Sequence, residues 1–220
     1  MPRTTTSMFT RDDLDRITAS VRAAERNTSG EIVPFIVDQS DPYEEAEWRC
    51  GSLMAVIALG AMSAIHSFSN SWLPIDMAEI ALAALCAGIA GVVAAKYVPV
   101  VKRFFAGNHL IERRVAQRAA QAFLSEEVFA TRDRTGILLF VSLLEHRVLV
   151  LGDAGINAKV EHADWGGIVQ TAIRGIQSDR PADGIVEAIG KCGDLLGRHG
   201  VARRPDDTDE LSDEARLRPR

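Results

Sequence analysis

The sequence has few of the patterns by which enzymes and nucleic-acid-binding proteins are usually identified. It has no G-x-S-x-G motif, no P-loop, no H-E-x-x-H, no C-x-x-C and no DxDx phosphatase motif near a strand end. Its three cysteines, Cys50, Cys86 and Cys192, are widely spaced and form neither a metal-binding pattern nor a disulfide framework. The formal net charge of −5 argues against nonspecific nucleic-acid binding, which needs a basic face.

Two long apolar runs are present instead, Cys50 to Phe68 and Ile80 to Ala95. The first has no charged residue over about 18 positions, which suffices to cross a hydrocarbon core about 30 Å thick. Trp48 and Trp72 bracket this run at a spacing that suits the two headgroup levels. The alternative is a pair of buried core helices, but such helices usually keep a polar stripe. We therefore expect a transmembrane hairpin in the lipid bilayer.

The lysines and arginines around the runs predict the orientation of the hairpin. The connection from Ser69 to Glu79 has none. They occur instead before the first run and after the second, at Arg49, Lys96, Lys102 and Arg103. By the positive-inside rule both termini are cytoplasmic, which predicts a multi-pass protein of the cell inner membrane. The segment MPRTTTSMFTRDD lacks the apolar core of a cleavable signal peptide, so we expect the first run to direct insertion.

The rest of the chain alternates between helical and strand patterns. Thr10 is a candidate N-cap for a helix that ends near Asn27. The segment from Glu31 to Asp38 is β-branched and apolar, although Pro34 predicts an edge position or a bulge. Two later strands follow each other so tightly that they must pair antiparallel. The remaining predicted elements are a helix at Leu110 to Ala130, strands at Ile137 to Leu143 and Arg147 to Leu151, and helices at Asp164 to Gln177 and Pro181 to His199.

This order of elements predicts an α/β fold, in which a small mixed sheet is sandwiched by helices and a two-helix transmembrane hairpin is inserted. The α/β domain comprises residues 1–49 and 99–200, and the hairpin comprises residues 50–98. Residues 201–220 mix Arg, Asp, Glu and Pro with few apolar groups, which predicts a disordered tail.

Three stretches carry a resemblance to a known family: TSGEIV at Thr28 to Val33, RTGILLFVSLLEHRVLVLGDAGI at Arg134 to Ile156, and Trp165 after them. They resemble the TPM domain family (TLP18.3, Psb32 and MOLO-1) over Phe9 to Gly200. The chain is most similar to the bacterial branch with an internal membrane hairpin, including an acidic tail at Asp206 to Leu211.

The resemblance implies a TPM-like α/β sandwich and two kinds of function. Some TPM domains act as acid phosphatases or bind divalent cations, whereas others are assembly or accessory factors for membrane complexes. Most members face the lumen or periplasm, whereas the charges of this chain predict a cytoplasmic domain.

Polar residues are expected to gather at the carboxyl ends of the first two strands if these run parallel. Asp38 and Asp41 follow the first strand, and Ser142, Glu145 and His146 end or follow the second. Open α/β sheets bind ligands at this edge, and carboxylate oxygens suit Ca²⁺ or Mg²⁺. The alternative is that Glu145 and His146 are solvated turn residues and that Asp38 caps its strand.

A second group, Glu31, Arg134, Thr135 and Asp153, is expected at the opposite end of the sheet. Two unpaired carboxylates close together repel, and a cation such as Ca²⁺ or Mg²⁺ relieves the repulsion. Glu31 and Asp153 are therefore candidate metal ligands. The alternatives are that Arg134 neutralises them, or that Asp153 forms an Asx-type turn.

We expect an integral membrane protein whose cytoplasm-facing TPM-like domain acts as a binding or assembly module for other membrane proteins. The alternative is a metal-dependent phosphatase of the TPM type. Because no nucleophile motif is present, such an enzyme would use metal-activated water held by separated carboxylates. Convergence of Asp38, Asp41 and Glu145, or of Glu31 and Asp153, on one cleft would favour the phosphatase.

Overall fold

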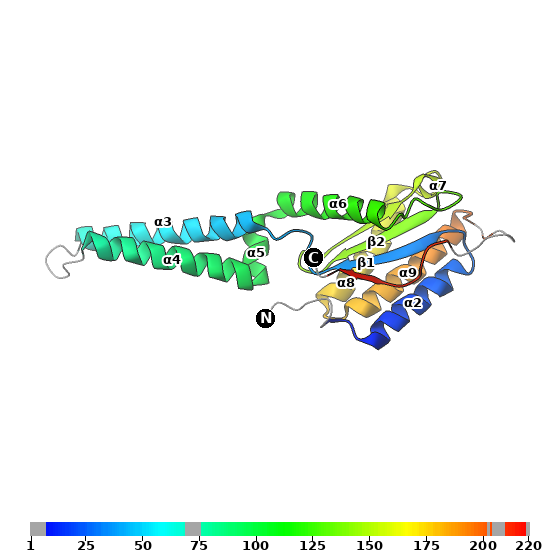
Figure 1. The fold of residues 1–220 in the computed structure, drawn as a ribbon, viewed down its shortest axis with the longest axis horizontal. Helices are drawn as coiled ribbons and strands as arrows, with labels where there is room; N and C mark the ends of the chain where they lie inside the picture. Colours follow the sequence, from blue (N-terminus) through cyan, green and yellow to red (C-terminus); the bar gives the residue numbers. More distant parts are fainter. Residues whose placement is uncertain (1–7, 69–75, 202, 204–209, 219–220) are drawn as a thin grey trace. The chain divides into compact units, whose positions relative to one another are not determined.

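The computed structural model of the protein describes residues 8–68, 76–201, 203 and 210–218. The chain forms two compact units, one built from Pro42–Glu112 and an α/β unit built from the chain before and after it. The α/β class predicted from the sequence is confirmed. The elements, labelled in Figure 1, are α2 (Arg11–Glu25), β1 (Glu31–Val37), α3 (Glu44–Phe68), α4 (Met77–Tyr97), α5 (Pro99–Ala106), α6 (Asn108–Ser125), β2 (Gly136–Ser142), β3 (Arg147–Gly152), α7 (Ala154–Asn157), the 3-10 helix η1 (His162–Trp165), α8 (Gly166–Gln177), α9 (Pro181–Arg198) and β4 (Arg216–Arg218).

Helix α2 begins where the sequence predicts. The Thr10 hydroxyl accepts a hydrogen bond from the Asp13 amide at 3.1 Å, and the Asp13 carboxylate accepts one from the Thr10 amide at 3.0 Å. This capping box satisfies amides that the first helical turn leaves unpaired. Ile17 and Val21 lie one turn apart on the same face and are fully buried, so α2 packs its apolar stripe into the α/β unit.

The sheet has the strand order β3-β2-β1-β4. Strands β1 and β2 run parallel, from Glu31 opposite Gly136 to Val37 opposite Ser142. Strand β3 is antiparallel to β2, as the short connection predicts. Every residue of β1 and β2 is buried. Figure 1 gives the reason, since α2, α8 and α9 lie on one face of the sheet and α6 lies over the other.

The position of Pro34 in β1 is explained by the direction of the strand amides. The Glu31 amide donates to the carbonyl of Thr135, the residue just before β2, at 3.2 Å, whereas the Ile32 amide donates to the Glu25 carboxylate at 2.6 Å. Amide directions alternate along a strand, so position 34 faces away from β2. Strand β4 pairs with Phe35 to Val37, beyond the proline. The predicted edge position is therefore correct only for the first part of β1. There Pro34, which has no amide hydrogen, loses no hydrogen bond to a neighbouring strand.

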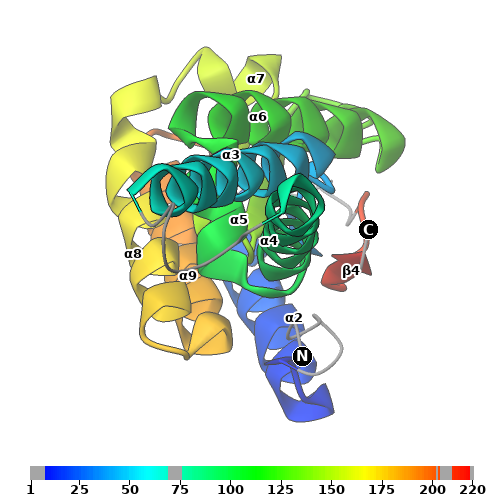
Figure 2. The same cartoon turned by 90° about the vertical axis from the view of Figure 1, so that its left-hand side faces the viewer.

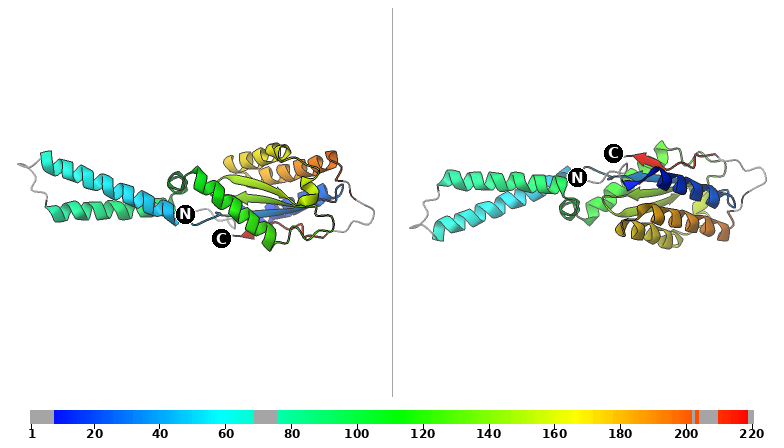
Figure 3. Two further views of the ribbon diagram at one scale, coloured as in Figure 1. Left: turned by 90° about the horizontal axis from the view of Figure 1, so that it is seen from above. Right: turned by 90° about the horizontal axis from the view of Figure 1, so that it is seen from below.

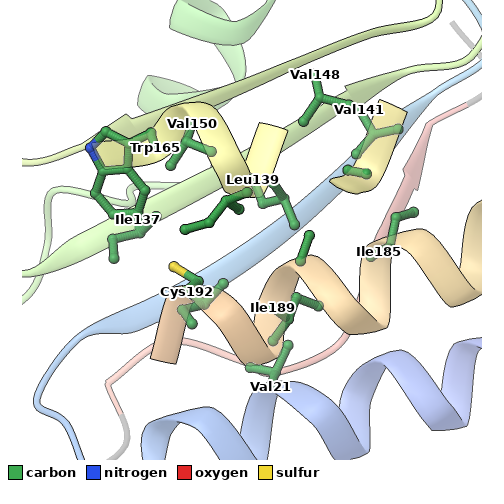
Figure 4. Packing of buried hydrophobic residues seen from close by; sticks show 14 of the residues in the cluster. Val21, Ile137, Leu139, Val141, Val148, Val150, Trp165, Ile185, Ile189 and Cys192 are labelled. Atoms are coloured by element: carbon green, nitrogen blue, oxygen red, sulfur yellow. The ribbon is translucent and has the colours of Figure 1, made fainter. Parts of the chain in front are cut away.

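The larger core lies between the sheet and the helices α2, α8 and α9. Alternate residues of the strands face these helices, because side chains of a strand point to opposite faces in turn. Trp165 belongs to this cluster and is buried, so it is a packing residue. Figure 4 labels these members of the core: Val21, Ile137, Leu139, Val141, Val148, Val150, Trp165, Ile185, Ile189 and Cys192.

The other face of the sheet is also apolar. Phe35 and Phe140 stack there with their ring centroids 5.9 Å apart, and Ala119 of α6 is fully buried. The helix predicted to reach Ala130 ends earlier, at Ser125. The Val128 amide donates to the carbonyl of Phe123 at 3.1 Å, a bond over five residues that closes a helix rather than extending it.

The predicted disordered tail over residues 201–220 is wrong for the part that the structure describes beyond 209. Strand β4 pairs parallel with β1. Arg216 and Arg218 bind Glu126 at 3.3 and 3.2 Å, and Arg22 binds Asp213 at 2.7 Å. The charged residues that predicted disorder instead form ion pairs with α2 and with the end of α6.

The second unit consists mainly of α3 and α4, which pack side by side (Figures 2 and 3). Helix α3 begins at Glu44, before the predicted run, because Glu44, Glu45 and Glu47 suit the positive end of the helix dipole. The boundary predicted between residues 49 and 50 therefore falls inside a helix. Asp76 is the N-cap of α4, and its amide donates to the Glu79 carboxylate at 3.3 Å.

Candidate functional site

Helices α3 and α4 leave most of their apolar side chains exposed. Within their most apolar stretches, 6% of α3 and 11% of α4 are buried. The structure thus disagrees with the alternative of two buried core helices, which would bury the apolar stripe. Leu82 and Leu85 are each 60% exposed, and Ile89 is 56% exposed. Both helices are long and apolar enough to cross a membrane.

The surfaces that α3 and α4 bury are those that face each other, and glycine makes this contact possible. A Cβ at Gly51 would lie 2.6 Å from Cγ2 of Val92 and 3.0 Å from the Gly88 carbonyl oxygen. A Cβ at Gly91 would lie 3.0 Å from the Cys50 carbonyl oxygen. Close backbone approach at small residues is the usual way in which helices associate in lipid.

Aromatic residues lie where α3 begins and α4 ends. Trp48 is 69% exposed on α3, and Tyr97 is exposed at the end of α4. The Lys96 ammonium lies 5.8 Å from the centroid of the Tyr97 ring. Exposed Trp and Tyr beside basic residues are typical of a membrane–water interface. Trp72, the predicted partner of Trp48 at the other headgroup level, lies outside the described residues.

A buried polar cluster lies at the carboxyl ends of β1 and β2, where the sequence predicts a site. The Ser142 hydroxyl donates to the Glu145 carboxylate at 2.5 Å, and the Ser40 amide donates to the same carboxylate at 2.8 Å. The Ser40 and Ser142 hydroxyls are 2.8 Å apart. Ser142 and Glu145 are buried, so Glu145 is not the solvated turn residue of the alternative. The cluster fastens the segment after β1 to the end of β2.

The other three residues predicted for this site have separate roles. The Asp41 carboxylate lies 3.3 Å from Nε of Arg114. The Asp38 carbonyl accepts a hydrogen bond from the Leu144 amide at 2.8 Å, which continues the pairing beyond β1. His146 has a φ of 51° and ends the turn between β2 and β3. The structure therefore groups Ser142 with Glu145 and pairs Asp41 with an arginine.

At the opposite end of the sheet, Asp153 forms a two-pronged ion pair with Arg134. The Arg134 Nε and Nη2 atoms lie 2.5 and 2.9 Å from the two carboxylate oxygens. Asp153 is buried and also accepts from the Ala154 amide at 2.7 Å. The Arg134 hydrogen bonds, more than that amide, hold the pKa of Asp153 below its usual value. Arg134 thus neutralises the Asp153 carboxylate, which is the alternative to a metal site that the sequence left open.

Glu31 and its neighbours bind the carboxyl-terminal segment. The Glu31 carboxylate accepts from the amides of Glu210 and Leu211 at 3.3 and 3.4 Å. The Asp213 carboxylate accepts from Nε of Arg22 at 2.7 Å, and the Glu25 carboxylate accepts from the Ile32 amide at 2.6 Å. Burial, together with the charges of Glu31 and Asp213, raises the pKa of Glu25 to about 9.

Ser40, Glu25 and Asp213 were not predicted from the sequence as site residues. Each becomes important only through a residue distant in the chain, and no local pattern marks it. Among the described residues, no group of three or more His, Cys, Asp or Glu side chains is placed to hold a metal ion. Binding of Ca²⁺ or Mg²⁺ by Glu31 and Asp153 stays a prediction, with both carboxylates already hydrogen-bonded.

Comparison with known proteins identifies a shared fold. No family model and no curated protein matches the chain. Among solved structures, the chain is similar to the NMR structure of the BA42 protein from the psychrophilic bacterium Bizionia argentinensis. The TM-score is 0.58 at 19% sequence identity, covering 96% of this chain and 95% of BA42. At this identity the similarity establishes the fold alone.

Proposed function

We propose that the protein is an integral membrane protein of the inner membrane, in which α3 and α4 cross the bilayer as a hairpin. The α/β unit is then a cytoplasm-facing, TPM-like domain that acts as a binding or assembly module for other membrane proteins. The observation that carries the proposal is the exposed apolar surface of both helices, of whose most apolar stretches 6% and 11% are buried. In water such a surface would cost about 25 cal/mol for each Å² left exposed.

The charge distribution supports the orientation. Arg49, Lys96, Lys102 and Arg103 all lie at the end of the hairpin where α3 begins and α4 ends. The connection between the helices carries no Lys or Arg in the sequence. Basic residues accumulate on the cytoplasmic side of membrane proteins, so both termini are assigned to the cytoplasm.

Reporter fusions test this orientation. A reporter that is active only in the cytoplasm, fused after Arg220, is expected to be active, and a periplasm-specific reporter at the same place is expected to be silent. As the matched control, the same reporters inserted between α3 and α4 should give the opposite result. Activity of the periplasmic reporter after Arg220 would overturn the topology.

The partners of the predicted acidic ligands favour a binding module over a phosphatase. Asp153 is paired with Arg134, Asp41 with Arg114, and Glu145 with two serines. A metal-dependent phosphatase needs several carboxylates that are available to one ion. Hydrolysis of a generic phosphate ester that depends on added Mg²⁺ and disappears in Asp153→Asn would favour the phosphatase instead.

The module itself is tested by purification of the detergent-solubilised protein with the proteins that accompany it. The control is Gly136→Val, which disturbs the α/β unit while leaving α3 and α4 unchanged. Membrane proteins that accompany the wild-type chain and are lost from the variant bind the α/β unit. Identical sets of proteins from both chains would contradict an assembly role for that unit.

A further inference from the structure

Helix α5 presents its apolar residues outward and its lysine inward, the reverse of a surface helix in a soluble protein. Val100 and Phe104 lie one turn apart and are 65% and 77% exposed. Lys102, between them in the sequence, is buried. A surface helix normally turns its apolar stripe to the protein and its charges to water. The exposed stripe of α5 therefore indicates that another apolar medium covers it.

Polar contacts fix α5 in this orientation. The Lys102 ammonium donates to the Pro42 carbonyl oxygen at 3.0 Å and lies 3.1 Å from the Glu47 carboxylate. At the end of the helix, Arg49 donates to the Phe105 carbonyl oxygen at 3.2 Å. A buried charge is expensive to leave unpaired, so rotating Lys102 outward to hide the apolar stripe would break these contacts.

The placement of α5 suits the surface of a bilayer. Figures 1 and 3 show α5 turned across the long direction of α3 and α4, at the end of α4. A helix that lies across two membrane-spanning helices at their base lies in the plane of the headgroups. The residues that lead from the end of α4 into α5, Tyr97, Val98 and Val100, are also exposed.

We infer that α5 is an interfacial helix that inserts Val100 and Phe104 into the cytoplasmic leaflet, with Lys96 and Arg103 at the level of anionic lipid phosphates. This inference rests on the proposed function, because it needs α3 and α4 in the bilayer. Lys96 is exposed and Arg103 partly so, and both carry the charge that anionic headgroups attract. The occupant of the apolar stripe is thus the boundary between headgroups and acyl chains, about 5–10 Å deep.

Spin-label accessibility tests the inference in the full chain, reconstituted in vesicles of phosphatidylcholine and phosphatidylglycerol. Cys50, Cys86 and Cys192 are first replaced by alanine. Single labels are then placed by Phe104→Cys, by Leu85→Cys within α4, and by His109→Cys as an exposed control just beyond α5. Frequent collision of the spin label with oxygen shows that the label is exposed to lipid. Frequent collision with a water-soluble nickel chelate shows that it is exposed to water. We expect an oxygen-to-nickel ratio several-fold higher at 104 than at 109, and higher still at 85.

The three labels separate the possible failures. Lipid exposure at 85 with water exposure at 104 would overturn the interfacial helix and leave the transmembrane hairpin standing. Water exposure at 85 would overturn the proposed function and the inference together. A label at 104 that meets neither oxygen nor nickel would mean that a protein covers the stripe, which also overturns the inference.

A second measurement needs no cysteine replacement. Phe104→p-benzoylphenylalanine in the otherwise unchanged chain is irradiated in native membranes, with the same substitution at His109 as control. Covalent attachment of lipid at position 104, and several-fold less at 109, is the expected result. Attachment of another protein at position 104 in place of lipid would contradict the inference.

Discussion

The two units of this protein treat apolar side chains in opposite ways. In the α/β unit, Ile189 of α9 is fully buried against the sheet, whereas Ile89 of α4 is 56% exposed. Both isoleucines lie in helices, so neither composition nor secondary structure distinguishes them. The α/β unit buries its apolar surface within itself, whereas α3 and α4 leave most of theirs exposed.

The largest effect is expected from Gly136→Val, at the start of β2. A Cβ at this position would lie 1.8 Å from the carbonyl oxygen of Val128, a backbone atom with little room to move. We expect the free energy of unfolding of the α/β unit to fall by about 3 kcal/mol or more, as when a core is overpacked. Near-ultraviolet circular dichroism of the detergent-solubilised protein during heating measures this loss.

The control for Gly136→Val is Gly190→Ala, in α9, where no described atom lies within 4 Å of an added Cβ. This variant should unfold at the wild-type temperature or slightly above it, because alanine favours helix. Equal stability of Gly136→Val and the wild type would show that the described contact with Val128 is wrong.

A matched pair of isoleucines tests the comparison itself. Ile189→Ala removes a fully buried side chain and should destabilise the α/β unit by about 2–5 kcal/mol. Ile89→Ala removes an exposed side chain of α4 and should change the unfolding of the α/β unit by less than about 0.5 kcal/mol. Comparable losses in both variants would mean that Ile89 is buried against protein rather than lipid.

Glu25 makes the stability of the α/β unit depend on pH. Its pKa of about 9 in the folded protein lies above the ordinary value of 4.5, so the folded state holds the proton more tightly. The stabilisation is therefore complete below pH 4.5 and is lost as the pH rises toward 9. Through this one group, the free energy of unfolding can fall by at most about 1.4 kcal/mol for each pH unit.

Glu25→Gln imitates the protonated side chain at every pH. Denaturant unfolding between pH 5 and pH 8 should show a decline of about 1 kcal/mol or more in the wild type, and a smaller decline in the variant. Asp12→Asn, an exposed change in the same helix, should keep the wild-type slope. A slope unchanged by Glu25→Gln would show that the pKa of Glu25 is not raised in the folded protein.

The smallest effect concerns divalent cations. Since Arg134 already occupies both oxygens of Asp153, calorimetric titration of the full chain with Ca²⁺ or Mg²⁺ should give little heat. Asp153→Asn should give the same small signal. A clear binding isotherm that disappears in Asp153→Asn would instead establish Asp153 as a metal ligand.

Predictions from the sequence succeeded where a pattern is contained in one segment. The apolar runs identified both membrane-length helices, all of β1 and all but the first residue of β2, because burial on both faces requires continuous apolar residues. The N-cap at Thr10 was likewise predicted from neighbouring residues. Strand β4 was missed, since a strand as short as Arg216–Arg218 has no recognisable period and depends on pairing with β1.

The candidate sites show the same limit. The sequence placed Ser142 and Glu145 at one end of the sheet, and it offered Arg134 as the partner of Asp153. It could not show that Glu145 is buried, because one of the two hydrogen bonds that make its burial tolerable comes from Ser40, far away in the chain. Similarly, Glu25 can accept the hydrogen bond from the Ile32 amide of β1 only after α2 has packed beside that strand.

Labelling of the native cysteines tests the membrane assignment most directly. Of the three cysteines, Cys86 of α4 is exposed in the structure, whereas Cys50 and Cys192 are buried. In intact membranes, a charged maleimide that does not cross lipid should fail to modify Cys86, because a bilayer around α4 would keep this water-soluble reagent away from the thiol. Full reaction should appear after denaturation in sodium dodecyl sulfate. Rapid modification of Cys86 in undisturbed membranes would contradict the assignment of α3 and α4 as a transmembrane hairpin.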